Sequence, residues 1–179
     1  MRATREIRLL TDIVEETKYI LATEYNFGPD QIQAIRTRID ATGKQFAFGS
    51  FMFPIKNLRL DYTVQRDIIV KHVIKIMTRY NPQLCAPASA VIDDLEKLDL
   101  EDLMNSTALP SIYDGQHRIV ATAILGYDEV PVTIVEDDRP SFPSYAFEML
   151  NEKGVARLTP GDLHRNALTR FRLKSREPK

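Results

Sequence analysis

Four chemically active side chains and one glycine stand together in Asp114-Gly115-Gln116-His117-Arg118, directly before a run of apolar and small residues. A carboxylate, an amide, an imidazole and a guanidinium in so short a stretch could hold an anion or exchange a proton. Asp-Gly is common in the two-residue turn of a hairpin, whereas a glycine at the start of a helix lets an anion approach the backbone closely. The chemistry therefore depends on which of these two turns the chain makes.

Periodicity favours the helix. Apolar residues between 119 and 124 recur at spacings of three and four, two alanines favour helix, and Gly126 stands where a helix C-cap would be. Residues 111–113 are apolar enough for a strand, and residues 130–135 form a stronger one, rich in β-branched side chains. We predict strand, turn, helix, strand, with Asp114 as the helix N-cap.

In that arrangement Gly115 to Arg118 form the first helical turn, whose backbone N–H groups have no intrahelical acceptor and attract an anion. Arg118 can bind phosphate through two parallel hydrogen bonds, and His117 adds a donor. His117, Gln116 and Asp114 are the candidates for catalysis, although an amide takes no proton and a capping carboxylate is a poor base. The alternative is that Asp114 only caps the helix while His117 and Arg118 are ordinary surface residues.

The composition limits what surrounds this turn. The 179 residues, 44% hydrophobic and 27% charged, suit one main core, and no apolar run is long enough to span a membrane. The N-terminus lacks a secretion signal, and the single cysteine, Cys85, is typical of a reducing compartment, so we expect a cytoplasmic protein. With a net charge of −1, any contact with nucleic acid must come from a local basic patch.

The remaining patterns predict both helices and strands, in an α+β fold with an N-terminal helical extension. His72 lies beside the buried stripe of one helix, and we favour a surface or boundary role over a catalytic one for it. We expect the sheet to begin near Phe46, in an edge strand broken at Pro54. The predicted helices cover residues 11–25, 28–40, 67–80 and 93–105, the last with an acidic solvated face, and a further strand covers residues 88–92.

Residues 114–135, DGQHRIVATAILGYDEVPVTIV, resemble the signature of the ParB/sulfiredoxin-like superfamily, in which a strand leads into a G-x-H/R-R turn, a helix, a glycine and a "vPV" strand. PIKNLRLDYTVQRD at 54–67 is similar to the segment with "Q-x-R" that precedes this signature in the family. FEMLNEKGVARLTPGDLHRNAL at 147–168 resembles a helical segment of ParB proteins and of DGQHR proteins from phages and DNA-modification clusters. The resemblance spans about residues 46–170.

The resemblance implies a ParB/sulfiredoxin-like core at 44–140, a small mixed sheet flanked by helices. An N-terminal extension at 1–43 precedes this core, and a C-terminal helical segment with a basic tail at 141–179 follows it. It implies that Gly115, Gln116, His117, Arg118, Gln65 and Arg66 contact a nucleotide of CTP or ATP type. ParB proteins hold Mg²⁺ through adjacent Glu-Asn; here Leu150 precedes Asn151, so Mg²⁺ with a nucleotide stays an open expectation. Gln116 replaces the cysteine of sulfiredoxins and the glutamate of ParB proteins, which argues against sulfiredoxin chemistry.

Three functions remain open. The first is a ParB-like nucleotide-binding protein, with slow nucleotide hydrolysis as one possibility. The second is a nonenzymatic DNA-binding or regulatory module, and the third is a ParB-like nuclease. The partners we expect are a nucleotide, a second copy of the chain in a homodimer, and DNA, but no membrane. Four basic residues of the tail are the candidates for contacting a nucleic-acid backbone: Arg165, Arg170, Arg172 and Lys174.

Overall fold

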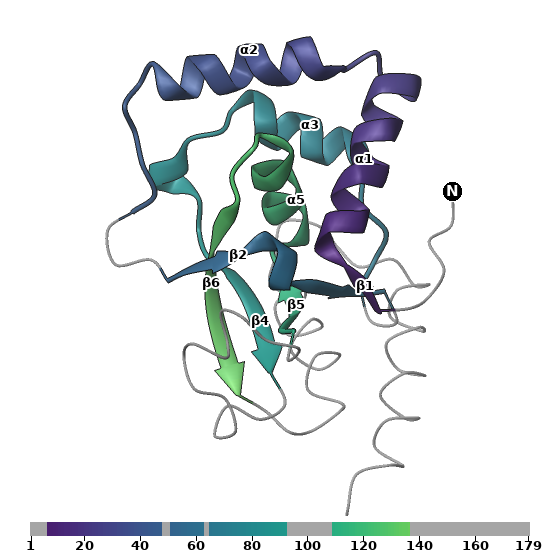
Figure 1. Ribbon diagram of the computed structural model, residues 1–179, viewed down its shortest axis with the longest axis vertical. Coiled ribbons are helices and arrows are strands. Elements are labelled where there is room, and N and C mark those ends of the chain that lie inside the picture. The colour runs from purple at the N-terminus through teal and green to yellow at the C-terminus, as the bar shows by residue number, and fades with distance from the viewer. Residues whose placement is uncertain (1–6, 48–50, 63–64, 93–108, 137–179) are drawn as a thin grey trace, which may run out of the picture.

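The computed structural model describes residues 7–47, 51–62, 65–92 and 109–136. These residues form a mixed α+β architecture with a six-stranded sheet and four α-helices, so the predicted class is confirmed (Figure 1). The strands are β1 (Ile7–Leu9), β2 (Met52–Pro54), β3 (Arg59–Asp61), β4 (Ala88–Ile92), β5 (Ser111–Asp114) and β6 (Glu129–Glu136). The helices are α1 (Leu10–Glu24), α2 (Pro29–Asp40), α3 (Val70–Thr78) and α5 (Gln116–Ile124), with single 3₁₀ turns η1 (Ile55–Asn57) and η2 (Pro82–Leu84).

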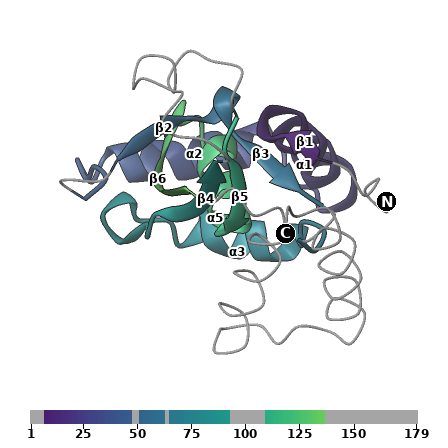
Figure 2. The ribbon, with the colours of Figure 1, turned by 90° about the horizontal axis from the view of Figure 1, so that it is seen from below.

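The strand order across the sheet is β1-β3-β5-β4-β6-β2. The pairs β3–β5 and β4–β6 are parallel, and the other three pairs are antiparallel. Figure 2 shows β1 and α1 toward one side of the sheet and β2 and β6 toward the other. The strand β5, from which the predicted functional turn leaves, is therefore an inner strand whose neighbours fix it on both sides.

Helix α5 lies at the centre of the packing, in contact with α1, α3, β4 and β6. Its apolar residues share one core cluster with alternate residues of the inner strands, such as Ala90 and Ile112. The next residues along the same strands, Val91 and Tyr113, form a separate buried pair, as expected when successive strand residues point to opposite faces. The predicted functional turn is thus the first turn of the most deeply packed helix described.

Both predicted N-terminal helices are present, as α1 and α2, but the prediction that the sheet begins near Phe46 is wrong. The sheet begins at β1, which pairs antiparallel with β3. A three-residue strand, Ile7–Leu9, is too short to show the alternation by which strands are found in a sequence. The domain boundary after residue 43 stays a prediction, although Leu10, Ile13 and Leu21 belong to the same core cluster as the sheet.

The segment predicted as a broken edge strand divides as expected at Pro54, which ends the edge strand β2. The second piece, β3, is an inner strand because η1 carries the chain to the other side of the sheet. Helix α3 starts three residues later than predicted, since Ile69 before it is extended. The strand at 88–92 has its predicted bounds. The acidic helix predicted at 93–105 lies outside the described residues.

Helix α2 lies across the top of the molecule in Figure 1. Two of its arginines bind the C-terminal ends of other helices. The Arg36 guanidinium donates to the carbonyl of Leu125 at the end of α5, and Arg38 donates to the carbonyl of Thr78 at the end of α3. A cation at a helix C-terminus is favoured by the helix dipole and satisfies a carbonyl that has no intrahelical donor. No helix in the described part of the chain has the length and apolar character needed to cross a bilayer.

We expect Arg36→Ala to lower the free energy of unfolding by about 1–2 kcal/mol. The substitution removes the bond to Leu125, the ion pair with Asp40 and the contact of the guanidinium with the Tyr127 ring, 4.0 Å from its centroid. Lys18→Ala, which removes an exposed ion pair with Glu15, is the control and should cost less than about 0.5 kcal/mol. Urea unfolding measures both; equal losses would contradict a special role for Arg36.

Candidate functional site

The predicted helix start at residues 114–118 is confirmed. Strand β5 ends at Asp114, and α5 begins at Gln116, so the hairpin alternative is excluded. The predicted cap is wrong: Gly115 occupies the N-cap position with φ +86°, and no side chain caps the helix. Its carbonyl accepts the N–H groups of Arg118 and Ile119, which leaves those of Gln116 and His117 without an intrahelical acceptor.

Gly115 is required by space as well as by its backbone angle. A Cβ there would lie 3.0 Å from the Cβ of Ala88 and 2.8 Å from Nη2 of Arg118. The left-handed conformation is costly for any residue with a side chain. Asp114, which does not cap the helix, forms an ion pair with Arg118, with 3.4 Å between Oδ2 and Nη2. Arg118 also donates to the carbonyl of Pro87 at 3.2 Å. These contacts hold the guanidinium over the turn.

Two predicted binding residues, Gln65 and Gln116, join the chain before α3 to β5 and to the turn, respectively. The buried Gln65 amide donates to the carbonyl of Ile112 in β5, and Gln65 has no exposed surface. The Gln116 amide donates to the carbonyl of Arg66 at 3.1 Å. Gln116 Oε1 is buried and accepts no hydrogen bond from a described residue. As placed, Gln65 faces β5 rather than solvent.

His117 is buried, its Nε2 serves as an acceptor within the protein, and its predicted role as a donor to phosphate stays a prediction. Its Nε2 accepts the backbone N–H of Ile69 at 3.0 Å, and its ring stacks on that of His72, with centroids 4.9 Å apart and planes 19° from parallel. Burial, then the nearby His72 and Arg66, lower the pKa of His117 to about 3. Since Nε2 is occupied and the neutral ring carries its proton on Nδ1, neither nitrogen is ready to accept a proton.

Arg66 lies near this pair of imidazoles. Its charge contributes to lowering the pKa of both His117 and His72. The expectation that Arg66 and Arg118 contact the same nucleotide stays a prediction. The remaining predicted site residues, which are Asn151 and the tail residues Arg165, Arg170, Arg172 and Lys174, lie outside the described residues.

Arg118 lines a hollow of about 310 Å³ between the turn, α3 and η2. Three residues of α3 and its C-terminal end, His72, Lys75 and Arg79, add basic side chains, and no Asp or Glu is among its described lining residues. Ile76, Tyr80, Asn81, Leu84 and Cys85 complete the lining. The result is a basic hollow with an apolar side, directly beside the first turn of α5.

Sequence reasoning missed the contribution of α3 to this hollow. The sequence does hold a signal, since His72, Lys75 and Arg79 are spaced by three and four and so share one face of a helix. On an amphipathic helix such a face is usually solvated, so the spacing alone does not distinguish it from an ordinary surface. Only the packing of α3 against α5 brings that face to Arg118.

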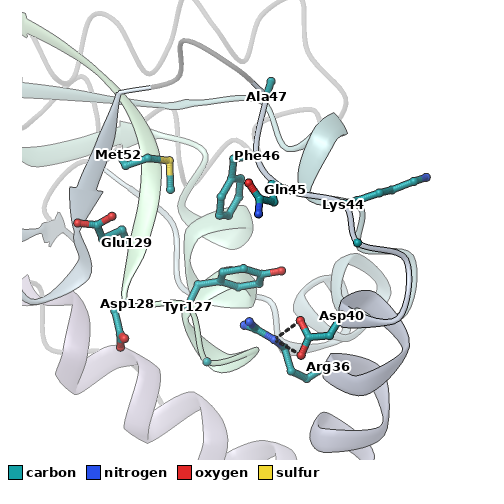
Figure 3. Close-up of a pocket in the computed structure, with 12 residues that line it drawn as sticks. Arg36, Asp40, Lys44, Gln45, Phe46, Ala47, Met52, Tyr127, Asp128 and Glu129 are labelled. Atoms are coloured by element: carbon teal, nitrogen blue, oxygen red, sulfur yellow. Dashed lines mark hydrogen bonds and ion pairs between the residues drawn. The ribbon is translucent and has the colours of Figure 1, made fainter.

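A larger hollow, of about 910 Å³, lies at the other end of α5 (Figure 3). Its centre is Tyr127, whose ring meets that of Phe46 edge-on and carries the Arg36 guanidinium on its face. Asp128 and Glu129 stand on one wall and Lys44 on the opposite side. This hollow contains none of the predicted site residues, and its arginine is already bound to Asp40. The smaller hollow has unmatched positive charge, which makes it the better candidate.

Within the described ranges, no group of three or more His, Cys, Asp or Glu side chains is placed to hold a metal ion. The turn offers one carboxylate, Asp114, which is next to Arg118. Comparison of this chain with protein-family models, with curated proteins and with solved structures finds no match.

Gly115→Ala should destabilise the protein more than Gly126→Ala, its matched control. Both glycines have positive φ, of 86° and 82°, but a Cβ at Gly126 meets nothing within 4 Å. Gly126→Ala should therefore cost about 1 kcal/mol, and Gly115→Ala about 1–3 kcal/mol more, because Ala88 must move. Chemical denaturation gives both values. An equal cost would show that β4 does not constrain the turn.

Acid should destabilise the protein through His117. The pKa of this group is about 3 in the folded chain and near 6.5 when unfolded, so the unfolded state binds more protons between these values. The contribution of neutral His117 to the free energy of unfolding is fully present above about pH 6.5. It decreases as the pH falls toward 3, and about 2 kcal/mol is lost at pH 5. His117→Gln, compared with wild type in urea unfolding at pH 7 and pH 5, should lose this component. An unchanged pH dependence in the variant would contradict the assignment.

Proposed function

We propose that this protein is a ParB-like nucleotide-binding protein, acting in a DNA-related process, that holds the phosphates of a CTP- or ATP-type nucleotide at residues 114–118 and in the adjoining basic hollow. The observation that carries the proposal is the position of Arg118, which lines this hollow together with His72, Lys75 and Arg79. The two first-turn N–H groups without an intrahelical acceptor lie at the start of the same helix. The sequence resemblance supports the same ligand class.

The charge balance of the hollow favours an anion with several negative charges. Lys75, Arg79 and Arg118 carry three positive charges, of which Asp114 offsets part of one. Such a group of like charges repels itself until a phosphate chain is bound, and each charged hydrogen bond formed contributes about 1.5–3 kcal/mol. Ile76 and Leu84 give the same hollow an apolar surface suited to a base.

The groups at the turn suit binding better than rapid hydrolysis. Gln116 cannot take a proton, and the Nε2 of His117 is occupied by the Ile69 N–H. Asp114 remains the one titratable carboxylate of the turn, held near Arg118 at 3.4 Å. Mg²⁺, if it accompanies the nucleotide, would neutralise phosphate charge, and the residue to which the resemblance assigns it is Asn151. A cytoplasmic location and a homodimer belong to the same proposal.

A nonenzymatic DNA-binding module is the second candidate. The observation in its favour is that His72, Lys75 and Arg79 lie in a row along α3, and a phosphodiester backbone could follow such a row. The two ligands differ in charge, because a nucleoside triphosphate carries several negative charges on one phosphate chain and each backbone phosphodiester carries one. A nuclease, the third function, would require metal-dependent cleavage of DNA.

We expect a nucleoside triphosphate to raise the melting temperature of the full chain. A thermal-shift panel of CTP, ATP, GTP, UTP and a short DNA, each with and without Mg²⁺, tests this, since a ligand of the native state stabilises it. Stabilisation by DNA alone, lost steeply as salt rises, would select the DNA-binding module instead. Nicking of a plasmid that depends on a divalent metal would select the nuclease.

Arg118→Ala should weaken nucleotide binding by about 10- to 150-fold, because one or two charged hydrogen bonds are lost. Lys71→Ala is the matched control: Lys71 is an exposed residue of α3 that does not line the hollow, so its loss should change affinity less than about twofold. Isothermal titration calorimetry measures both. Equal effects would mean that the hollow attracts the nucleotide only through the overall field of the protein.

Hydrolysis of a bound nucleoside triphosphate should be slower than about 1 s⁻¹, because the described groups at the turn offer no free general base. Gln116→Glu replaces the amide at the turn by a carboxylate, which can accept a proton. The substitution should raise the turnover if the lack of a general base at residue 116 limits the rate. Phosphate release under single-turnover conditions measures both proteins. A wild-type rate well above this value would require a base outside the groups described.

A further inference from the structure

His72 and His117 form a pair in which only one ring can change its charge. His117 is buried, and protonation of its Nε2 would place an N–H against the N–H of Ile69, 3.0 Å away. His72 stacks on His117 and also lines the basic hollow with Arg118. The first ring is therefore a fixed neutral support, and the second is the titratable group that a ligand in the hollow meets.

Without a ligand, the surroundings of His72 disfavour its protonated form. Partial burial, then Arg66, then Lys75, lower the pKa of His72. The other groups that face it are the neutral His117 ring from α5, and Arg79 and Arg118 across the hollow. No described carboxylate lines this hollow to offset them. An anion placed among these groups reverses the balance, because opposite charge favours the imidazolium.

We infer that His72 binds the phosphate ligand in its protonated form, so that occupation of the hollow takes up one proton from solvent at this residue. The inference rests on the proposed function, since it concerns the same hollow. His72 is a ligand-binding residue that makes affinity depend on pH, whereas His117 orients it by stacking. Affinity should rise as the pH falls through the pKa of His72 in the complex, and level off below its pKa in the free protein.

A solely structural role for His72 makes a different prediction. If the ring only covers His117, its protonation is independent of what the hollow contains, and its replacement changes stability without changing the pH dependence of binding. The two roles are therefore separated by measuring the titration of His72 itself in the free and occupied protein.

The test is an NMR titration of the imidazole C–H resonances from pH 5.5 to 8.5, without and with saturating inorganic pyrophosphate, on the full chain. His72→Gln assigns the resonance and keeps a planar group against His117. We expect the pKa of His72 to rise by one unit or more on binding, which corresponds to at least about tenfold tighter binding at low pH than at high pH. The resonance of His117 should not titrate in this range.

Two variants complete the design. His72→Gln should lose the additional affinity at low pH that wild type shows beyond the titration of pyrophosphate itself, and Lys71→Gln, on the same helix but outside the hollow, should keep it. If pyrophosphate shifts the amide resonances of the 114–118 turn while the pKa of His72 stays unchanged, the inference is overturned and the proposed function stands. If pyrophosphate shifts no resonance of the turn or the hollow at any pH, both are overturned.

Discussion

The left-handed backbone of Gly115 is the constraint on which the site depends. It allows an inner strand to pass into a buried helix within one residue, with β4 so close that a Cβ would lie 3.0 Å from that of Ala88. Because the reversal is so tight, the side chains of the first helical turn lie at the C-terminal end of the inner strand β5. They reach the chain before α3 on one side and the carbonyl of Pro87 on the other.

The polar residues of the turn divide into those that hold structure and those that face the hollow. Gln116 and His117 are both buried and are bonded to the backbone of Arg66 and Ile69, so they fix the start of α3 relative to α5. This attachment sets the position of the α3 face that carries Lys75. A buried neutral imidazole used in this way fixes geometry at the cost of sensitivity to acid.

The two ends of α5 carry different electrostatic arrangements, unmatched positive charge at one and a matched ion pair at the other. At its N-terminus Arg118 joins the basic residues of α3 around a hollow whose described lining holds no carboxylate. At its C-terminus the carbonyl of Leu125 is bound by Arg36, whose charge is matched by Asp40. A net charge of −1 for the chain conceals this separation, since composition does not record where charges gather.

The sequence by itself determined those features that depend on residues close together in the chain: the helices α1, α2 and α5, the strand β4, and the strand-to-helix turn at Gly115, each from periodicity and glycine placement. It did not determine that Gly115 rather than Asp114 is the N-cap of α5. An aspartate directly before a helix can either cap that helix or end the preceding strand, and the sequence is the same in both cases. The tertiary structure alone decided that His72 stacks on His117, 45 positions away, and that Lys75 and Arg79 face Arg118. The reason is physical: helical spacing states which residues share a face, but only the packing of α3 on α5 states what that face meets.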